Sequence, residues 1–132
     1  MNILPGVIYD FEVCENITLV KAQCNDQLLS SIIIETPTTV NYLTKGTSIK
    51  ILFKETEVII GKKSDFEISL QNQLPCRIIE IKKGALLSRI SLLFGEHEIR
   101  SIITTNAVKK LKLEVDMSVL AMIKTNEVMI AE

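Results

Sequence analysis

Apolar and polar residues alternate along much of the chain, and this period of two predicts β-strands. Near the N-terminus, four alternate apolar positions are expected to form the core face of one strand: Val7, Tyr9, Phe11 and Val13. Four later positions are expected to share one strand face: Leu86, Ile90, Leu92 and Phe94. Further strands are predicted over residues 99–104 and 119–124, and Val128 and Ile130 predict a last short strand.

Two short helices are expected among these strands. Thr36 followed by Pro37 has the pattern of an N-cap with proline at the first helical position. Asn106 is expected to cap a second helix. Gly46 and Asp116 follow the two helices and suit turns, because glycine and, less readily, aspartate adopt left-handed backbone.

The chain repeats itself at a constant offset of 70 residues, without a gap. Predicted hairpin turns at Asn25-Asp26 and Gly95-Glu96 keep this offset. Twelve identities join residues 4–60 to 74–130, at Leu4, Pro5, Ile8, Ser31, Ile32, Ile33, Leu43, Ser48, Lys54, Glu57, Val58, Ile60 and their partners.

The repeat predicts an all-β protein of two tandem OB-like, five-stranded small barrels, each with one short helix. We expect a first domain over residues 1–62, a second over 68–132 and a linker over 63–67, which is polar after Gly61. A unit of about 60 residues buries little surface alone. We therefore expect the two units to pair, or the chain to form a homo-oligomer.

Composition narrows the class of protein further. The 132 residues are 47% hydrophobic and 5% aromatic, with a net charge of −1. A near-neutral chain with few aromatic residues does not fit nucleic-acid binding. No stretch resembles a signal peptide or a membrane span, so we expect a soluble, cytoplasmic protein. The three cysteines (Cys14, Cys24 and Cys76) are widely spaced and are expected to be buried free thiols.

The sequence contains no arrangement of residues that is typical of a catalytic site. The single histidine, His97, stands between two glutamates and is interpreted as a solvated turn residue, since no other ligand completes a metal site. Neither phosphate-binding glycine motif occurs. Glu55, Glu57 and Glu127 are interpreted as exposed charges at strand edges. We expect neither catalysis nor a directly bound metal ion.

One polar cluster remains. Residues 69–73 read Ser-Leu-Gln-Asn-Gln before the first strand of the second copy, and Lys124, matched by Lys54, ends its fourth strand. Hydroxyls, amides and an ammonium group suit a small oxyanion. The alternative is that these are solvated residues at strand ends, and spacing alone leaves both open.

The second copy resembles the molybdopterin-binding-protein (Mop) family, also called the TOBE fold. The resemblance begins with Ser-Leu-Gln-Asn-Gln-Leu at 69–74 and continues through the Lys-Lys-Gly at 82–84. It extends over Ile-Ile-Thr at 102–104, Val-Lys-Lys-Leu-Lys-Leu at 108–113 and Val-Leu-Ala-Met-Ile-Lys at 119–124. The first copy resembles the family more faintly, so the whole chain resembles a tandem Mop protein.

This resemblance implies cytoplasmic binding of molybdate or tungstate for storage, homeostasis or sensing. The anion would be held through its own oxygens, at contacts between Mop units of a homo-oligomer, without an organic cofactor. The residues implied for the site are Ser69, Gln71, Asn72, Thr104 and Lys124, and a second site would use Asn2 and Lys54.

Two departures keep alternatives open. Gln71 stands where the family has arginine, and Ala107 stands where it has serine, so a positive charge and a hydroxyl are lost. One alternative is a ligand-sensing module that acts on a partner protein of molybdate transport or regulation. The other is a degenerate structural assembly that binds no ligand.

Overall fold

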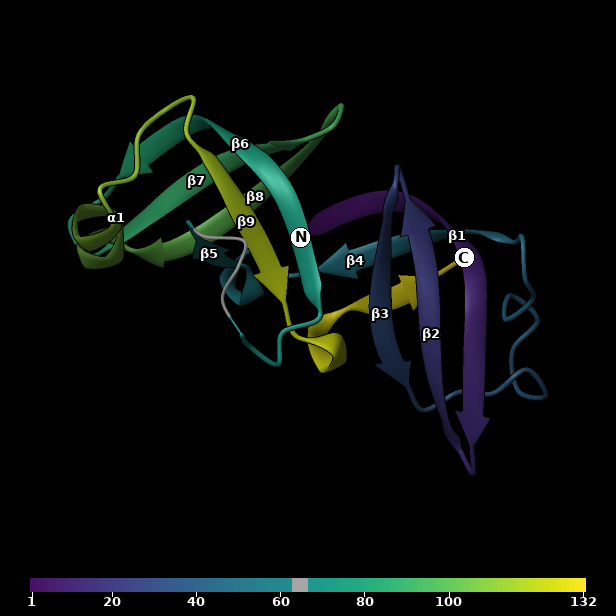
Figure 1. Ribbon diagram of the computed structural model, residues 1–132. Coiled ribbons are helices and arrows are strands. Elements are labelled where there is room, and N and C mark those ends of the chain that lie inside the picture. Colours follow the sequence, from purple (N-terminus) through teal and green to yellow (C-terminus); the bar gives the residue numbers. More distant parts are fainter. Residues whose placement is uncertain (63–66) are drawn as a thin grey trace.

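The computed structural model describes residues 1–62 and 67–132, and its strands follow the 70-residue repeat (Figure 1). The first half contains β1 (Asn2–Cys14), β2 (Ile17–Cys24), β3 (Gln27–Ile33), β4 (Ser48–Phe53), the 3-10 turn η1 (Glu55–Glu57) and β5 (Ile59–Gly61). The second half contains β6 (Asn72–Lys83), β7 (Leu87–Phe94), β8 (His97–Thr104), α1 (Thr105–Leu111), β9 (Ser118–Ile123), η2 (Thr125–Glu127) and β10 (Met129–Ala131). Most of the predicted linker, residues 63–66, lies outside the described residues.

Two curled antiparallel sheets result, and they exchange their last strands. The first sheet has the order β10-β4-β1-β2-β3 and the second the order β5-β9-β6-β7-β8. Met129 of β10 pairs with Leu52 of β4, and Ile59 of β5 pairs with Met122 of β9. The all-β prediction of two five-stranded units is therefore confirmed, but each sheet takes its fifth strand from the other half of the chain. The division at residues 62 and 68 stays a prediction.

Local features recur at the same offset in both sheets. A β-bulge interrupts the long first strand after Ile8 in one half and after Ile78 in the other. The predicted hairpin turns are confirmed, and their first residues, Asn25 and Gly95, both have positive φ, at 55° and 60°. Bulges bend a strand and increase its twist, which curls each sheet around its own core.

Before the bulge, the face of β1 that packs inward is the opposite of the predicted one: Leu4 and Ile8 are buried, whereas Val7 and Tyr9 are exposed. The prediction failed there because residues 3–8 are apolar on both faces, so alternation alone does not indicate which face is covered. After the bulge, Phe11 is half-buried against the core as predicted, and Val13 is exposed. In the later strand, Ile90, Leu92 and Phe94 are buried as predicted, but Leu86 is 81% exposed because it precedes β7 in a turn. Buried side chains of both halves form one continuous apolar core.

The first half lacks its predicted helix. The Val40 amide donates to the Thr36 carbonyl at 3.1 Å, which makes one turn, and the backbone then continues irregularly to Gly46. Three β-branched residues over 38–40 disfavour helix here. Tyr42 is buried and donates to Glu35 at 2.9 Å, which holds the loop in place of a helix.

The second predicted helix does form, but its cap is Thr104 and not Asn106. The Thr104 hydroxyl accepts from the Ala107 amide, and Lys112 ends the helix in left-handed backbone. The turns expected at Gly46 and Asp116 are confirmed by φ values of 89° and 76°.

Two further expectations need correction. Cys24 and Cys76 are buried, and burial raises the pKa of Cys76 to about 12, but Cys14 is exposed at the end of β1. Glu55, Glu57 and Glu127 lie half-buried in the 3-10 turns and not at exposed strand edges. Within the described residues, no helix is long and apolar enough to cross a membrane.

Candidate functional site

Two buried asparagines join the halves of the chain. Asn72, at the start of β6, donates from Nδ2 to the Ser30 carbonyl at 2.8 Å and accepts at Oδ1 from the Ser30 amide at 2.7 Å. Asn2, at the start of β1, makes the same pair with Arg100, with both distances 2.8 Å. Each asparagine thus completes the backbone hydrogen bonding of a strand in the other half, as a β-ladder partner would. We call these pairs the Asn72 clamp and the Asn2 clamp.

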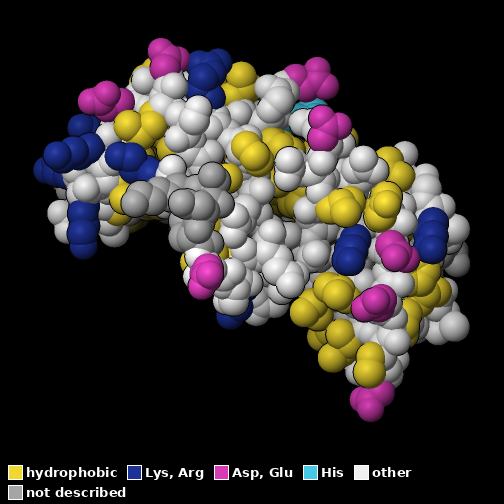
Figure 2. Space-filling view, viewed as in Figure 1, with side chains coloured by type: hydrophobic (Ala, Val, Ile, Leu, Met, Phe, Trp, Pro, Cys, Tyr) yellow, Lys and Arg dark blue, Asp and Glu magenta, His cyan; other side chains and the backbone are white. Residues whose placement is uncertain are grey.

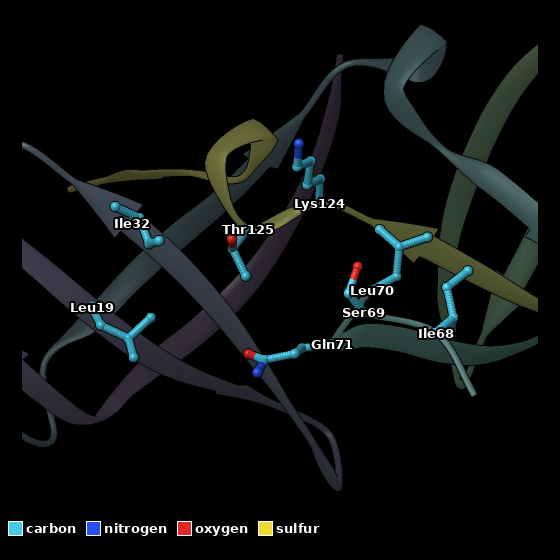
Figure 3. Close-up of a pocket in the computed structure, with 8 residues that line it drawn as sticks. All are labelled: Leu19, Ile32, Ile68, Ser69, Leu70, Gln71, Lys124 and Thr125. Atoms are coloured by element: carbon cyan, nitrogen blue, oxygen red, sulfur yellow. The ribbon is translucent and has the colours of Figure 1, made fainter. Parts of the chain in front are cut away.

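The Asn72 clamp lies beside a cavity of about 500 Å³ between the halves. Figure 3 shows the residues around it, which come from β2, β3, the segment before β6 and the start of η2. We call this cavity the Ser69 pocket; it is lined by Leu19, Ile32, Ile68, Ser69, Leu70, Gln71, Lys124 and Thr125.

Polar groups line one part of the Ser69 pocket and apolar groups the rest. Ser69 and Thr125 supply hydroxyls and Gln71 supplies an amide, and Leu19 and Ile32 lie on the side of the first sheet (Figure 3). Among its described lining residues, Lys124 is the one that carries a charge. Its exposed side chain points away from Gln71 in Figure 3, so it must change rotamer to meet a ligand held at that amide.

The structure brings together three of the residues predicted for the site, Ser69, Gln71 and Lys124. Asn72 lies next to them in the chain, but its amide is committed to the clamp. Thr104 does not line the Ser69 pocket; it is exposed and caps α1.

The residues named for a second site also separate. Lys54 is exposed before η1, and the Asn2 amide is held in the Asn2 clamp. Asn2 lines a smaller cavity of about 250 Å³, which we call the Glu55 pocket. The Glu55 pocket is lined by Met1, Asn2, Ile3, Glu55, Glu98 and Arg100.

Sequence reasoning missed Thr125 and the apolar wall of the Ser69 pocket. Thr125 directly follows Lys124, so its position beside the predicted lysine was the available signal. Leu19 and Ile32 pair across β2 and β3 on the outer face of the first sheet. Residues 32–33 are apolar on both faces of their strand, but this pattern does not indicate that a pocket would form there.

His97 is half-buried at the start of β8, and not simply a solvated turn residue. It lines a separate cavity of about 290 Å³ together with Cys24 and Gly6 of the first half. Within residues 1–62 and 67–132, no three His, Cys, Asp or Glu side chains are grouped so that they could hold a metal ion.

The two ends of the molecule differ in their surfaces. Hydrophobic side chains gather over the outer end of β1–β3, and lysines gather around α1 (Figure 2). The exposed apolar residues of the first end include Val13, Ile17, Ile32 and Ile34. This apolar surface adjoins the Ser69 pocket through Ile32.

The fold and pockets define a class of protein: a tandem pair of small β-barrels with a pocket between the units that is polar in one part and apolar in the rest. The family model of the TOBE domain matches residues 68–130, so the second half of the chain is a TOBE domain, and the first half is related to it by the 70-residue repeat.

Two solved structures are similar to the chain. A molybdate-bound crystal form of the cytoplasmic molybdate-binding protein ModG is 24% identical, with a TM-score of 0.91, over 98% of this chain and 94% of that one. MopII from Clostridium pasteurianum is 31% identical over 50% of this chain and 100% of its own, with a TM-score of 0.48. None of the curated proteins compared with the chain matches it.

Proposed function

We propose that this chain binds molybdate or tungstate in the Ser69 pocket, in the cytoplasm, and thereby stores or buffers the anion. The observation that carries the proposal is the polar part of that pocket's lining: two hydroxyls, an amide and one lysine, with no carboxylate among its described residues. A tetrahedral dianion needs donors and positive charge and is repelled by carboxylates. The fold shared with molybdate-bound ModG supports this choice of ligand.

The donors have distinct roles in this proposal. Ser69, Gln71 and Thr125 donate neutral hydrogen bonds to the oxygens of the anion, and Lys124 supplies its counter-charge. Gln73 donates to the Leu70 carbonyl at 2.8 Å and so fixes the turn that presents Ser69 and Gln71. The Asn72 clamp holds the first sheet against this turn without touching the anion.

The Ser69 pocket is too large for one oxyanion. Its volume of about 500 Å³ is that of a site for a small organic ligand. We propose that a second copy of the chain covers the apolar wall and narrows the pocket, so that the site forms at a contact between copies. Thr104, exposed at the other end of the second sheet, is available to contribute from that copy. The storage role then belongs to a homo-oligomer.

Calorimetric titration tests the ligand. Wild-type protein is expected to bind molybdate and tungstate and to bind sulfate more weakly, because sulfate is smaller. Lys124→Ala is expected to weaken binding by about tenfold to a hundredfold, the value of a charge-assisted hydrogen bond. Lys54→Ala is the matched control: Lys54 has the same extended backbone before the equivalent 3-10 turn, and it is expected to leave affinity unchanged. The absence of heat with all three anions would contradict the proposal and favour a degenerate assembly.

A further inference from the structure

The Glu55 pocket is the internal counterpart of the Ser69 pocket. At the offset of 70 residues, Met1 corresponds to Gln71 and Glu55 to Thr125, and all four residues line their pockets. Both pockets adjoin an asparagine clamp and the start of a 3-10 turn. Two equivalent backbone positions therefore contribute to both pockets, and they carry different side chains.

The two pockets differ in the charged residues that line them. In the Glu55 pocket, Glu55 accepts from the Met1 ammonium at 3.2 Å and Glu98 accepts from Arg100 at 2.7 Å. The hydrogen bond and charge of Glu98, followed by the charges of Glu55 and Glu80, raise the pKa of Arg100. The cations of this pocket are thus already neutralised by carboxylates.

The Ser69 pocket has no such carboxylates among its described residues. The position equivalent to Glu55 is the neutral Thr125, which lines the Ser69 pocket. The position equivalent to Glu98 is Leu28, which is neutral and does not line it. A dianion entering the Glu55 pocket would meet two negative charges, and each would weaken binding by about tenfold in partly solvated surroundings.

We infer that Glu55 and Glu98 close the Glu55 pocket to oxyanions, so that each chain carries one oxyanion pocket of this kind, the Ser69 pocket. This inference rests on the proposed function. It makes the two glutamates specificity-determining residues that act by exclusion. It also explains why both halves of the repeat have an asparagine clamp, whereas the donors proposed to bind the anion lie in the second half.

Charge removal tests the inference. Glu55→Gln combined with Glu98→Gln keeps the side-chain shapes, frees Arg100 and is expected to double the molybdate bound per chain in a calorimetric titration. In a Lys124→Ala background, the same pair is expected to add one molybdate site per chain, while the affinity of the Ser69 pocket stays reduced. The pair Glu55→Thr and Glu98→Leu, which introduces the residues found at the equivalent positions 125 and 28, provides a second variant should the glutamines disturb folding.

The control pair is Glu57→Gln with Glu96→Gln. Glu57 lies in η1, as Glu55 does, and Glu96 directly precedes β8, the strand of Glu98. The control makes the same change of charge, and neither residue lines the Ser69 pocket or the Glu55 pocket. It is expected to leave the stoichiometry unchanged. If wild-type protein binds molybdate and neither folded Glu55/Glu98 pair adds a site, or if the control pair adds one equally, the inference is wrong while the proposed function stands. Wild-type protein that binds no oxyanion contradicts the proposed function, whatever the variants do.

Discussion

The two halves of the chain use the same frame in different ways. Both keep the strand positions, the bulge and the buried asparagine that clamps the other half. They differ in the pockets beside those clamps, where one half carries Glu55 and the other Thr125. The comparison separates residues that hold the halves together from residues that select a ligand. The predictions below test the stability of the protein and its ligand binding by separate substitutions.

The largest effect is expected from removing β10. A chain ending at Val128 loses the edge strand of the first sheet, including the half-buried Ile130, and its free energy of unfolding is expected to fall by about 4 kcal/mol. Hydrogen exchange should speed up at Ile51 and Leu52 of β4, in the half of the chain remote in sequence from the deletion. Faster exchange confined to β9 would contradict the strand exchange.

The clamps are expected to rank next. Asn72→Ala leaves the Ser30 amide and carbonyl without partners, and Asn2→Ala does the same at Arg100, so each should cost about 3 kcal/mol in urea unfolding. Titration with molybdate is expected to distinguish the two clamp variants by their affinity for the anion. Asn72→Ala is expected to weaken binding because it loosens the Ser69 pocket, whereas Asn2→Ala should not. Equal loss of affinity in both variants would contradict the separate roles of the two pockets.

High pH is expected to destabilise the protein through one buried group in each half, Cys76 and Tyr42. Burial raises the pKa of Cys76 from 9.0 to about 12, and burial, followed by its hydrogen bond to Glu35, raises the pKa of Tyr42 from 10.0 to about 12. Both groups keep their protons longer when folded, so their stabilisation is present below the unfolded pKa and is lost as pH rises toward 12. Between pH 9 and 11 the loss should be about 2 kcal/mol from Cys76 and about 1 kcal/mol from Tyr42.

Urea unfolding at a series of pH values measures this loss. Cys76→Ala should remove the larger part of the slope and Tyr42→Phe the smaller part. A slope that neither substitution changes would mean that these two groups do not titrate as their burial indicates.

The smallest effect is expected from restoring charge at the ligand pocket. Gln71→Arg adds a second cation beside Lys124 and should tighten molybdate binding by about tenfold. Gln23→Arg makes the same charge change on the exposed face of β2, away from the Ser69 pocket, and should leave affinity unchanged. Equal tightening in both variants would indicate a general effect of net charge.

Local signals in the sequence predicted the parts of the fold that depend on neighbouring residues. Turns such as Asn25-Asp26 are set by their own backbone preferences, and the repeat fixed where the strands recur. The strand exchange could not be predicted, because β5 and β10 have similar apolar patterns and suit either sheet. The buried face of β1 before its bulge was predicted wrongly for a related reason, since residues 3–8 are apolar on both faces of the strand.

The site was predictable only in part. Ser69, Gln71 and Lys124 stood out as polar residues at strand ends, and they share a pocket in the structure. Asn72 belongs to the same motif, but the strand it pairs with lies 42 residues away in sequence, so its role depended on the tertiary contact. The role inferred for Glu98 likewise depends on a tertiary contact. Glu98 lies on β8, and the sequence does not indicate that β8 packs beside Glu55.

Crystals grown with tungstate provide the most direct measurement of the central claim, because the heavy atom gives anomalous density wherever it is bound. The account predicts a peak bounded by Ser69, Gln71, Thr125 and Lys124, and none beside Glu55 and Glu98. Tungstate in the Glu55 pocket, or its absence from the Ser69 pocket at saturating concentration, would contradict the account.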